Sequence, residues 1–352
     1  MLSKARENTM SLLTYNEVTK KIAESRNKRK HLLIGNGFSI AYDKNIFTYD
    51  ALSKFVEDAQ NDLLKKLFRI NETRNFEQIM RQLDITAKLI KEFEAEDALV
   101  EKIVSTSIVL KESLIEAIEK LHPEHVFKIK EEEIKMCASF IMDFVRSFGY
   151  IFSTNYDILL YWVLMKHGEK NSFDFSDGFG RDALDEDGNV TNQQKKPELY
   201  WGKYMDTQNI FFLHGSLPLF YNGVYLTKET YDNKKTILEN ITKRMDRGSF
   251  PLFATGGTYR EKLNQILLNP YLRFCYDNLS DIEGSLVTFG FNFGQNDQHI
   301  INAINRSAAN SLSSIYIGVY SKEDQEHIKA IHHKFKCKNI YLFDAQTAKI
   351  WR

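Results

Sequence analysis

Short apolar runs that end abruptly in small or polar residues recur along this chain. Residues 150–157 show the pattern most clearly, because an apolar stretch ends there in Ser-Thr-Asn-Tyr-Asp and an amphipathic segment follows. The pattern predicts a buried strand that leads into a helix. Residues 31–34 run into Gly-Asn-Gly-Phe-Ser, and residues 209–213 run into a His-Gly pair. Ligands of open parallel sheets bind at the carboxyl ends of the strands, so we expect the three ends to form one site.

Further apolar runs alternate with helical segments toward the C-terminus. Residues 285–289, 314–320 and 339–343 are predicted to be strands, and their apolar positions are continuous rather than alternating. Continuous runs are typical of parallel strands that are buried on both faces. We therefore predict an α/β fold, with a Rossmann-like parallel sheet and helices on both faces. A hairpin is predicted around Asn222-Gly223, and residues 168–207 form a loop-rich segment that could cover the site.

The stretch between the first strand and the central one has a different composition. Residues 49–147 contain no glycine and one proline, and apolar residues recur at helical spacing. This periodicity predicts about four helices. We interpret residues 49–148 as a helical insertion, so that the sheet domain is formed by residues 1–48 and 149–352. Three roles for the insertion stay open, namely dimerisation, gating of the site and docking of a partner.

Charge and cysteine content narrow the class of protein. The 352 residues carry 47 basic and 47 acidic side chains, so no basic excess indicates binding to nucleic acid. The three cysteines lie far apart and form no Cys-x-x-Cys pair, which excludes a four-cysteine zinc site within one chain. The N-terminus has no signal-peptide pattern, and no uncharged apolar run approaches the roughly 20 residues that span a bilayer. We therefore expect a cytoplasmic protein without a membrane or nucleic-acid partner.

Four predicted strand ends together carry side chains that suit a dinucleotide. The glycine turn at residues 35–39 can cradle a pyrophosphate, because glycine lets backbone amides approach closely. The amide of Asn155 can hold a water or a ribose hydroxyl, and Asp157 can accept hydrogen bonds from a carboxamide. His214 can act as a general base near neutral pH. The fourth end, residues 290–292, adds Gly-Phe-Asn.

Each of these motifs also has a structural explanation. A Gly-Asn-Gly sequence forms tight turns, a His-Gly pair is often a turn, and Asn-Tyr-Asp can cap a helix. Ile40 replaces the third glycine of the dinucleotide fingerprint, which disfavours an ordinary dehydrogenase. The Gly-x-Ser-x-Gly nucleophile elbow and the phosphate-loop lysine motif do not occur in the sequence. The joint occurrence of the strand-end motifs, in this order, favours the functional interpretation.

Taken together, the motifs resemble the sirtuin signature. The glycine-rich loop at residues 35–39, the Ser-Thr-Asn-Tyr-Asp segment at residues 153–157 and the Leu-His-Gly segment at residues 213–215 are similar to the three sirtuin core motifs. A later segment, residues 290–300, resembles the adenosine-side segment, with Asn292 in place of a serine. The resemblance spans about residues 31–320. It is closest to a bacterial sirtuin-like branch of uncharacterised function that lacks the zinc module.

The resemblance implies an NAD site with assigned roles. Asn155 would position a water or a ribose hydroxyl near the anomeric carbon, Asp157 would hold the nicotinamide carboxamide, and His214 would be the general base. Asp297 and His299 would either contact the adenosine ribose or cap and pack the helix that follows. The residues that the resemblance places around the dinucleotide are Gly35, Asn36, Gly37, Phe38, Ser39, Thr154, Gly290, Asn292 and Asp297.

The lack of a four-cysteine zinc module bears on which sirtuin-like activity to expect, protein deacylation or NAD hydrolysis. Sirtuin deacylases carry a four-cysteine zinc module, so the resemblance favours NAD hydrolysis over protein deacylation here. We expect an NAD glycohydrolase that cleaves NAD to nicotinamide and ADP-ribose without a metal ion. The resemblance implies a regulated bacterial anti-phage defence effector that acts as a homo-oligomer or with a regulatory protein partner. The alternatives are a sensor that binds NAD or ADP-ribose without turnover and a zinc-free NAD-dependent deacylase.

Overall fold

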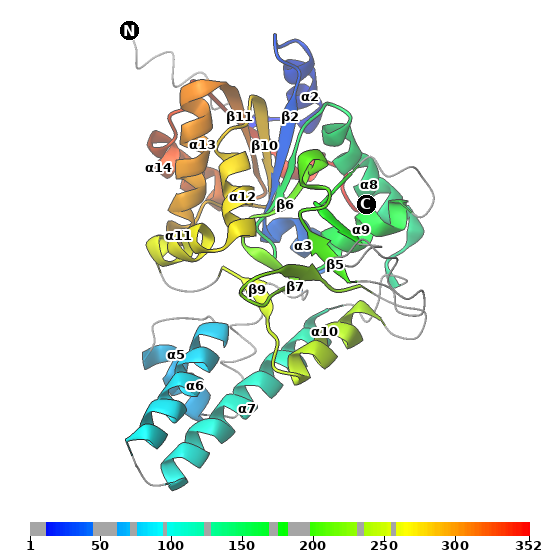
Figure 1. Cartoon of the computed structure of the whole chain (residues 1–352). Helices are drawn as coiled ribbons and strands as arrows, with labels where there is room; N and C mark the ends of the chain where they lie inside the picture. Colours follow the sequence, from blue (N-terminus) through cyan, green and yellow to red (C-terminus); the bar gives the residue numbers. More distant parts are fainter. Residues whose placement is uncertain are drawn as a thin grey trace.

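A seven-stranded parallel sheet forms the centre of the protein (Figure 1). The computed structural model describes residues 12–44, 62–70, 76–93, 97–122, 128–168, 175–181, 198–230, 236–254 and 258–352. The strand order is β1-β12-β11-β10-β2-β3-β6, and every pairing is parallel. The predicted α/β fold with a Rossmann-like sheet is therefore confirmed. The strands are β1 (Leu12–Leu13), β2 (Lys30–Ile34), β3 (Ile151–Ser153), β6 (Ile210–Phe212), β10 (Gly284–Phe289), β11 (Leu312–Val319) and β12 (Asn339–Asp344).

Helices cover the sheet because its central strands are apolar on both faces. Every position of β2, β3, β6 and β10 is buried. Helix α8 packs on β2 and β3, α12 packs on β6, and α13 and α14 pack on β11. The helices around the sheet are α2 (Tyr15–Ala23), α3 (Asn36–Tyr42), α8 (Glu131–Val145), α9 (Leu159–Gly168), α11 (Tyr259–Leu268), α12 (Pro270–Leu279), α13 (Gln298–Asn310) and α14 (Lys322–Ile331).

A second, antiparallel sheet leaves the first one just after β6, and the apolar pattern did not predict it. Its strand order is β4-β5-β8-β7-β9, and the expected Asn-Gly hairpin joins β7 to β8, with Gly223 at φ 95°. The chain turns at Gly215, where φ is 80° and a Cβ atom would lie 1.8 Å from the Leu252 carbonyl oxygen. His214 therefore sits at the junction of the two sheets. The strands are β4 (Phe179–Arg181), β5 (Leu199–Trp201), β7 (Gly215–Tyr221), β8 (Leu226–Lys228) and β9 (Pro251–Phe253).

A helical body projects from the sheet region (Figure 1). It consists of α5 (Asp62–Ile70), α6 (Phe76–Glu92) and α7 (Asp97–Leu121), and α10 (Ile237–Asp246) packs beside α7. Helix α8 falls within the expected insertion of residues 49–148, yet it packs on the central sheet. Of the segments that the structure describes, none is a helix with both the length and the apolar character that a membrane crossing requires.

Candidate active site

Four strand ends meet at one edge of the central sheet. Ile34 is in register with Ser153 on one side and with Phe289 on the other, and Ser153 is in register with Phe212. The residues that follow β2, β3, β6 and β10 are therefore neighbours in space. They contribute one polar cluster, part of a second and part of the wall of a cleft.

The first cluster, which we call the carboxylate cluster, consists of Ser39, Asn155 and Asp157. The side-chain amide of Asn155 donates to Ser39 Oγ at 2.9 Å, and Ser39 Oγ donates to Asp157 Oδ2 at 2.6 Å. The other carboxylate oxygen, Oδ1, accepts the Leu159 amide at 2.9 Å at the start of α9. Asp157 thus caps a helix, as the structural explanation expects, and also anchors Ser39 with its second oxygen.

Burial controls the protonation of Asp157. The side chain is 3% exposed, and desolvation raises the pKa of the carboxyl from its ordinary value of 3.8 to about 6. The hydrogen bonds from Ser39 and Leu159 act in the opposite direction, since they stabilise the charged form. Asp157 is therefore a carboxyl group that exchanges its proton close to neutral pH.

The side-chain oxygen of Asn155 is buried in an unusual state. Asn155 is 2% exposed, and no group among the described residues donates a hydrogen bond to its Oδ1. An unpaired buried acceptor costs about 1–3 kcal/mol, so such an atom calls for an explanation. Binding of a ligand hydroxyl or N–H group at Oδ1 would supply one.

The glycine-rich segment after β2 forms the N-cap and first turn of α3, and it is held by the loop after β10. The amide of Gly35 donates to the Phe289 carbonyl at 3.0 Å, and that of Gly37 donates to the Gly290 carbonyl at 2.8 Å. A Cβ atom on Gly37 would lie 2.5 Å from the Gly290 Cα atom. The small size of these glycines is therefore required for the close approach of the start of α3 to the loop after β10. Their amides already have protein acceptors, so phosphate binding here would have to use other donors.

A cleft of about 1130 Å³ opens beside the two clusters. Its wall combines the strand ends with residues from α11, α14 and the C-terminal end of the chain. Ser39, Asn155 and Asp157 lie beneath this wall rather than in it, and so do Gly35 and Phe38. The site residues predicted from the sequence that do line the cleft are Asn36, Gly37, Thr154, His214, Gly290, Asn292 and Asp297.

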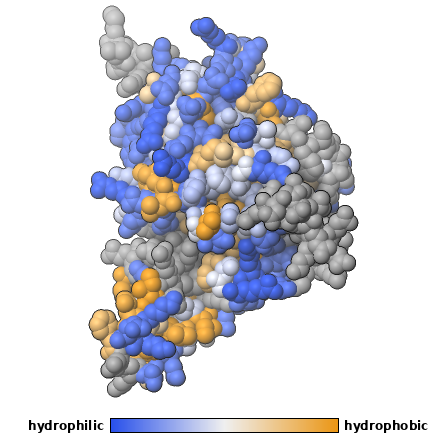
Figure 2. All heavy atoms as spheres, in the orientation of Figure 1, coloured by the Kyte–Doolittle hydropathy of each residue, from blue (hydrophilic) through white to orange (hydrophobic). Residues whose placement is uncertain are grey.

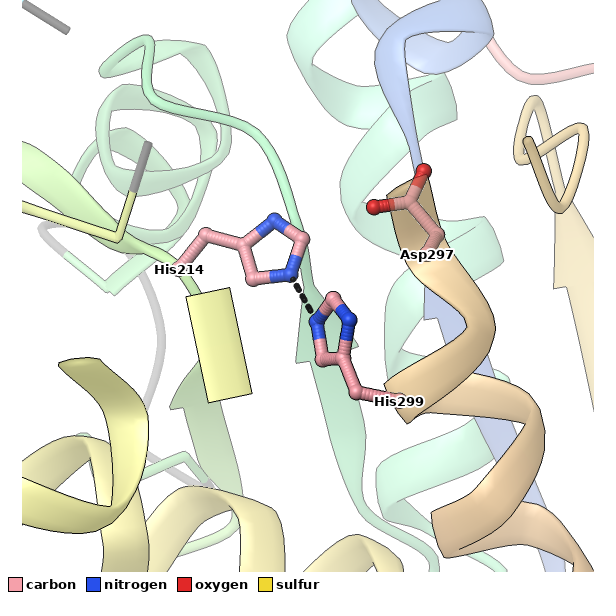
Figure 3. Close-up of side chains that lie close together, drawn as sticks. All are labelled: His214, Asp297 and His299. Atoms are coloured by element: carbon pink, nitrogen blue, oxygen red, sulfur yellow. Dashed lines mark hydrogen bonds between the residues drawn. The ribbon is translucent and has the colours of Figure 1, made fainter. Parts of the chain in front are cut away.

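The second cluster, which we call the histidine cluster, consists of His214, His299, Asp297 and Lys262 (Figure 3 shows the first three). His214 Nε2 and His299 Nε2 are 2.8 Å apart and share a hydrogen bond. Burial, followed by the Lys262 ammonium and His299, holds the pKa of His214 well below its ordinary value. Burial lowers the pKa of His299 to about 4, although the Asp297 carboxylate raises it. Both imidazoles are therefore neutral at neutral pH.

The carboxylate of this cluster is engaged by a lysine. Lys262 Nζ lies 3.0 Å from Asp297 Oδ1, and both side chains are largely buried. The ligand atoms of Asp297, His214 and His299 lie within 4.8 Å of one another, which is the spacing of a possible metal-ligand set. However, the two histidines already bond to each other and Lys262 places a positive charge beside them. A metal ion would have to displace these contacts.

The sequence did not identify Lys262 or Trp351 as part of the site. Lys262 lies in α11, after a Thr258–Glu261 capping box that indicates only a helix start. Trp351 lines the cleft next to the end of the chain, and its Nε1 donates to the Phe38 carbonyl at 2.9 Å. No motif marks either residue, because their roles depend on contacts with distant segments.

Comparison with known proteins places the chain in a family without assigning an activity. No curated protein matches the chain. A family model described as a domain of unknown function, DUF4917, matches residues 32–351. The match covers the central sheet from β2 onward, the antiparallel sheet, the helical body and both polar clusters. The chain therefore belongs to the DUF4917 family.

Proposed function

We propose that this protein is a sirtuin-like NAD glycohydrolase that cleaves NAD to nicotinamide and ADP-ribose. The observation that carries the proposal is the meeting of the carboxylate cluster and His214 at the carboxyl ends of neighbouring parallel strands, which is where such sheets bind ligands. The adjoining cleft of about 1130 Å³ offers room for a dinucleotide, since it exceeds the volume of most small-molecule pockets.

The reaction makes modest chemical demands on the protein. Nicotinamide leaves NAD as a neutral molecule and takes the electron pair of its bond to the ribose C1′ atom. The protein has to stabilise an oxocarbenium-like transition state and orient the attacking water. The water oxygen bonds to C1′ while its proton passes to a base and then to solvent.

Each cluster supplies one part of this chemistry. Asn155 Oδ1 is the unpaired acceptor that would hold the water or a ribose hydroxyl, and Asp157 would receive the carboxamide of nicotinamide. His214 lines the cleft and is neutral, as a base must be before it accepts a proton. Because Asn155 and Asp157 lie beneath the wall, substrate binding has to displace the segment around Thr154 and Tyr156.

Hydrolysis of NAD would harm the cell that makes this enzyme, so its activity has to be regulated. We propose that it is a regulated cytoplasmic effector of anti-phage defence.

The helical body offers a contact surface for such regulation, since apolar side chains gather there (Figure 2). We propose that a second copy of the chain covers this surface, and sedimentation as a monomer at micromolar concentration would contradict that. The exposed apolar residues of α5, α6 and α7, together with Phe93 just after α6, are Leu63, Ile70, Ile85, Leu89, Phe93, Leu99, Val104 and Ile108.

Variants at the two clusters test the activity. His214→Ala and Asn155→Ala should each lower the rate of nicotinamide release by about 100-fold or more, because each removes a group that acts on the reacting atoms. Matched controls are His333→Ala and Asn310→Ala, since both residues are exposed and neither lines the cleft. A chelator should leave the rate unchanged. Full activity in both cluster variants would refute the proposal.

The second candidate is a sensor that binds NAD or ADP-ribose without cleaving it. The observation in its favour is the burial of Asn155 and Asp157 beneath the cleft wall, which leaves His214 and Thr154 as the members of these motifs that line the cleft. Saturable ADP-ribose binding with no nicotinamide release would support the sensor.

A further inference from the structure

The backbone amides that follow β2 are engaged by the protein, so the phosphates of a dinucleotide would need other donors. The amides of Gly35 and Gly37 donate to carbonyls at the end of β10 and just after it, at 3.0 and 2.8 Å. The Phe38 amide donates to the Gly35 carbonyl at 2.9 Å. Phosphates carry negative charge, so a cationic side chain on the cleft wall can take the place of these amides.

The cleft wall carries three lysine or arginine residues among those that the structure describes, namely Lys44, Lys262 and Arg352. Lys44 is exposed, and the Arg352 side chain is 77% exposed and lies 3.7 Å from Glu133. The Lys262 side chain is 14% exposed, and its helix α11 packs against α13. Lys262 is therefore the cation that the fold itself fixes in the wall.

Lys262 contacts the segment that joins the end of β10 to the end of β6. This segment starts at Gly290 after β10 and reaches His299, which bonds to His214 after β6. Lys262 Nζ donates to Asp297 within it, and a carboxylate oxygen of Asp297 lies within 4.8 Å of a His214 ring nitrogen. In the proposed reaction His214 acts beside the C1′ atom of the nicotinamide ribose, and the same ribose carries a phosphate on C5′. The phosphate next to the reacting ribose therefore falls in the region that Lys262 reaches.

The Lys262 ammonium has more donors than the protein uses. It carries three N–H groups, and Asp297 Oδ1 accepts from it at 3.0 Å. No other group among the described residues accepts a hydrogen bond from this ammonium, so two of its hydrogens are left for water or a ligand. Polar groups in such largely buried positions usually have partners. Asp297 at the same time fixes the ammonium at the cleft, which both residues line.

We propose that Lys262 donates to an oxygen of the phosphate that adjoins the nicotinamide ribose, while Asp297 holds its ammonium in place. Lys262 is a binding residue, since it touches the ligand, and Asp297 is a positioning residue that acts through it. A lysine ammonium is a compact point charge that commonly binds phosphate. The inference rests on the proposed function for the identity of the ligand, and it holds equally for the sensor, because it concerns binding rather than cleavage.

ADP-ribose is the probe that tests this contact without turnover, because it keeps both phosphates and is a product of the proposed reaction. Lys262→Gln alone would leave the largely buried Asp297 carboxylate without its partner, so the variants are built on Asp297→Asn. The Asp297→Asn variant is compared with the double variant that also carries Lys262→Gln, so the two differ only in the ammonium. Calorimetric titration should show that the double variant binds ADP-ribose at least about tenfold more weakly. Both variants should bind adenosine equally, because adenosine has no phosphate.

Lys329→Gln is the matched control, since Lys329 is exposed and does not line the cleft. Its Kd for ADP-ribose should stay within about twofold of wild type, because an isolated surface charge contributes little. Thermal melting shows whether each variant is folded. In turnover experiments, KM for NAD should rise in the double variant relative to Asp297→Asn with a smaller change in kcat, because the phosphate contact is present both before and during the reaction.

The outcomes separate this inference from the proposed function. Equal ADP-ribose affinities in the folded single and double variants would overturn the phosphate contact, as would an equal loss of adenosine affinity or a loss of kcat at unchanged KM. If ADP-ribose binding depends on Lys262 but wild type releases no nicotinamide, then the glycohydrolase is refuted and the phosphate contact stands. If wild type binds neither NAD nor ADP-ribose, both are refuted.

Discussion

The carboxylate cluster and the histidine cluster lie at the same edge of the sheet but are built differently. Ser39 lies in α3, which follows β2, while Asn155 and Asp157 lie in the loop that follows the neighbouring strand β3, and hydrogen bonds link Asn155 to Ser39 and Ser39 to Asp157. The histidine cluster instead gathers its members from the end of β6, from α11 and from the segment before and within α13. The first cluster is sealed beneath the wall of the cleft, and the second is partly exposed to it.

Because of this difference, we expect substitutions in the two clusters to have different effects on folding and on the reaction rate. The carboxylate cluster joins α3 to the start of α9, so changes there should alter folding as well as activity. In the histidine cluster, His214 lines the cleft, so a change at this ring should alter the rate.

The largest expected effect on stability comes from Asp157. Its folded-state pKa of about 6 lies above the ordinary value of 3.8, so the folded protein binds the proton more tightly than the unfolded chain does. Proton binding at Asp157 therefore adds to the free energy of unfolding below pH 3.8, and this contribution is lost as the pH rises to about 6. The contribution is about 3 kcal/mol.

Asp157→Asn mimics the neutral carboxyl group and should remove this pH dependence. At pH 7.5 the variant should be at least as stable as wild type by chemical denaturation, yet its rate of nicotinamide release should fall. Ser39→Ala is the comparison variant, because it removes a partner of the buried carboxylate and should destabilise. If the Asp157→Asn variant unfolds more easily than wild type at pH 7.5, then the charged form of the Asp157 carboxyl group stabilises the fold, which contradicts the prediction.

A smaller effect is expected where the two loops touch. Gly37→Ala places a Cβ atom 2.5 Å from Gly290 Cα, so the loops have to separate, at a cost of about 1–3 kcal/mol. Gly294→Ala is the matched control, since the nearest atoms would lie 3.7 Å away. Urea denaturation of both variants measures the difference. Equal midpoints would mean that the loops adjust freely.

The sequence predicted the sheet and the carboxylate cluster for physical reasons. Parallel strands are buried on both faces and so leave continuous apolar runs, as at β2, β3 and β10. Once β2 and β3 are neighbours, the polar residues that follow them must also be neighbours. The hairpin between β7 and β8 was predictable because an Asn-Gly pair between two apolar runs indicates a turn, and Gly223 adopts a φ of 95° there.

The antiparallel sheet and the histidine cluster left no comparable signal. Strands β4 and β5 have three residues each, which is too short for a period to emerge. His214 and His299 are separated by 85 positions, and helical spacing does not reveal which strand end a residue of α13 will face. The sequence likewise does not distinguish Lys262 from other charged residues, because its ion pair with Asp297 depends on the packing of α11 beside α13.

The most direct test of the glycohydrolase is the fate of water in the reaction. Purified wild-type protein would be incubated with NAD in water enriched in ¹⁸O. The products would be separated by chromatography, and their masses would be measured by mass spectrometry. The account predicts nicotinamide together with ADP-ribose that carries one ¹⁸O atom, because water attacks the ribose carbon. Saturable binding of NAD with no release of nicotinamide would contradict it.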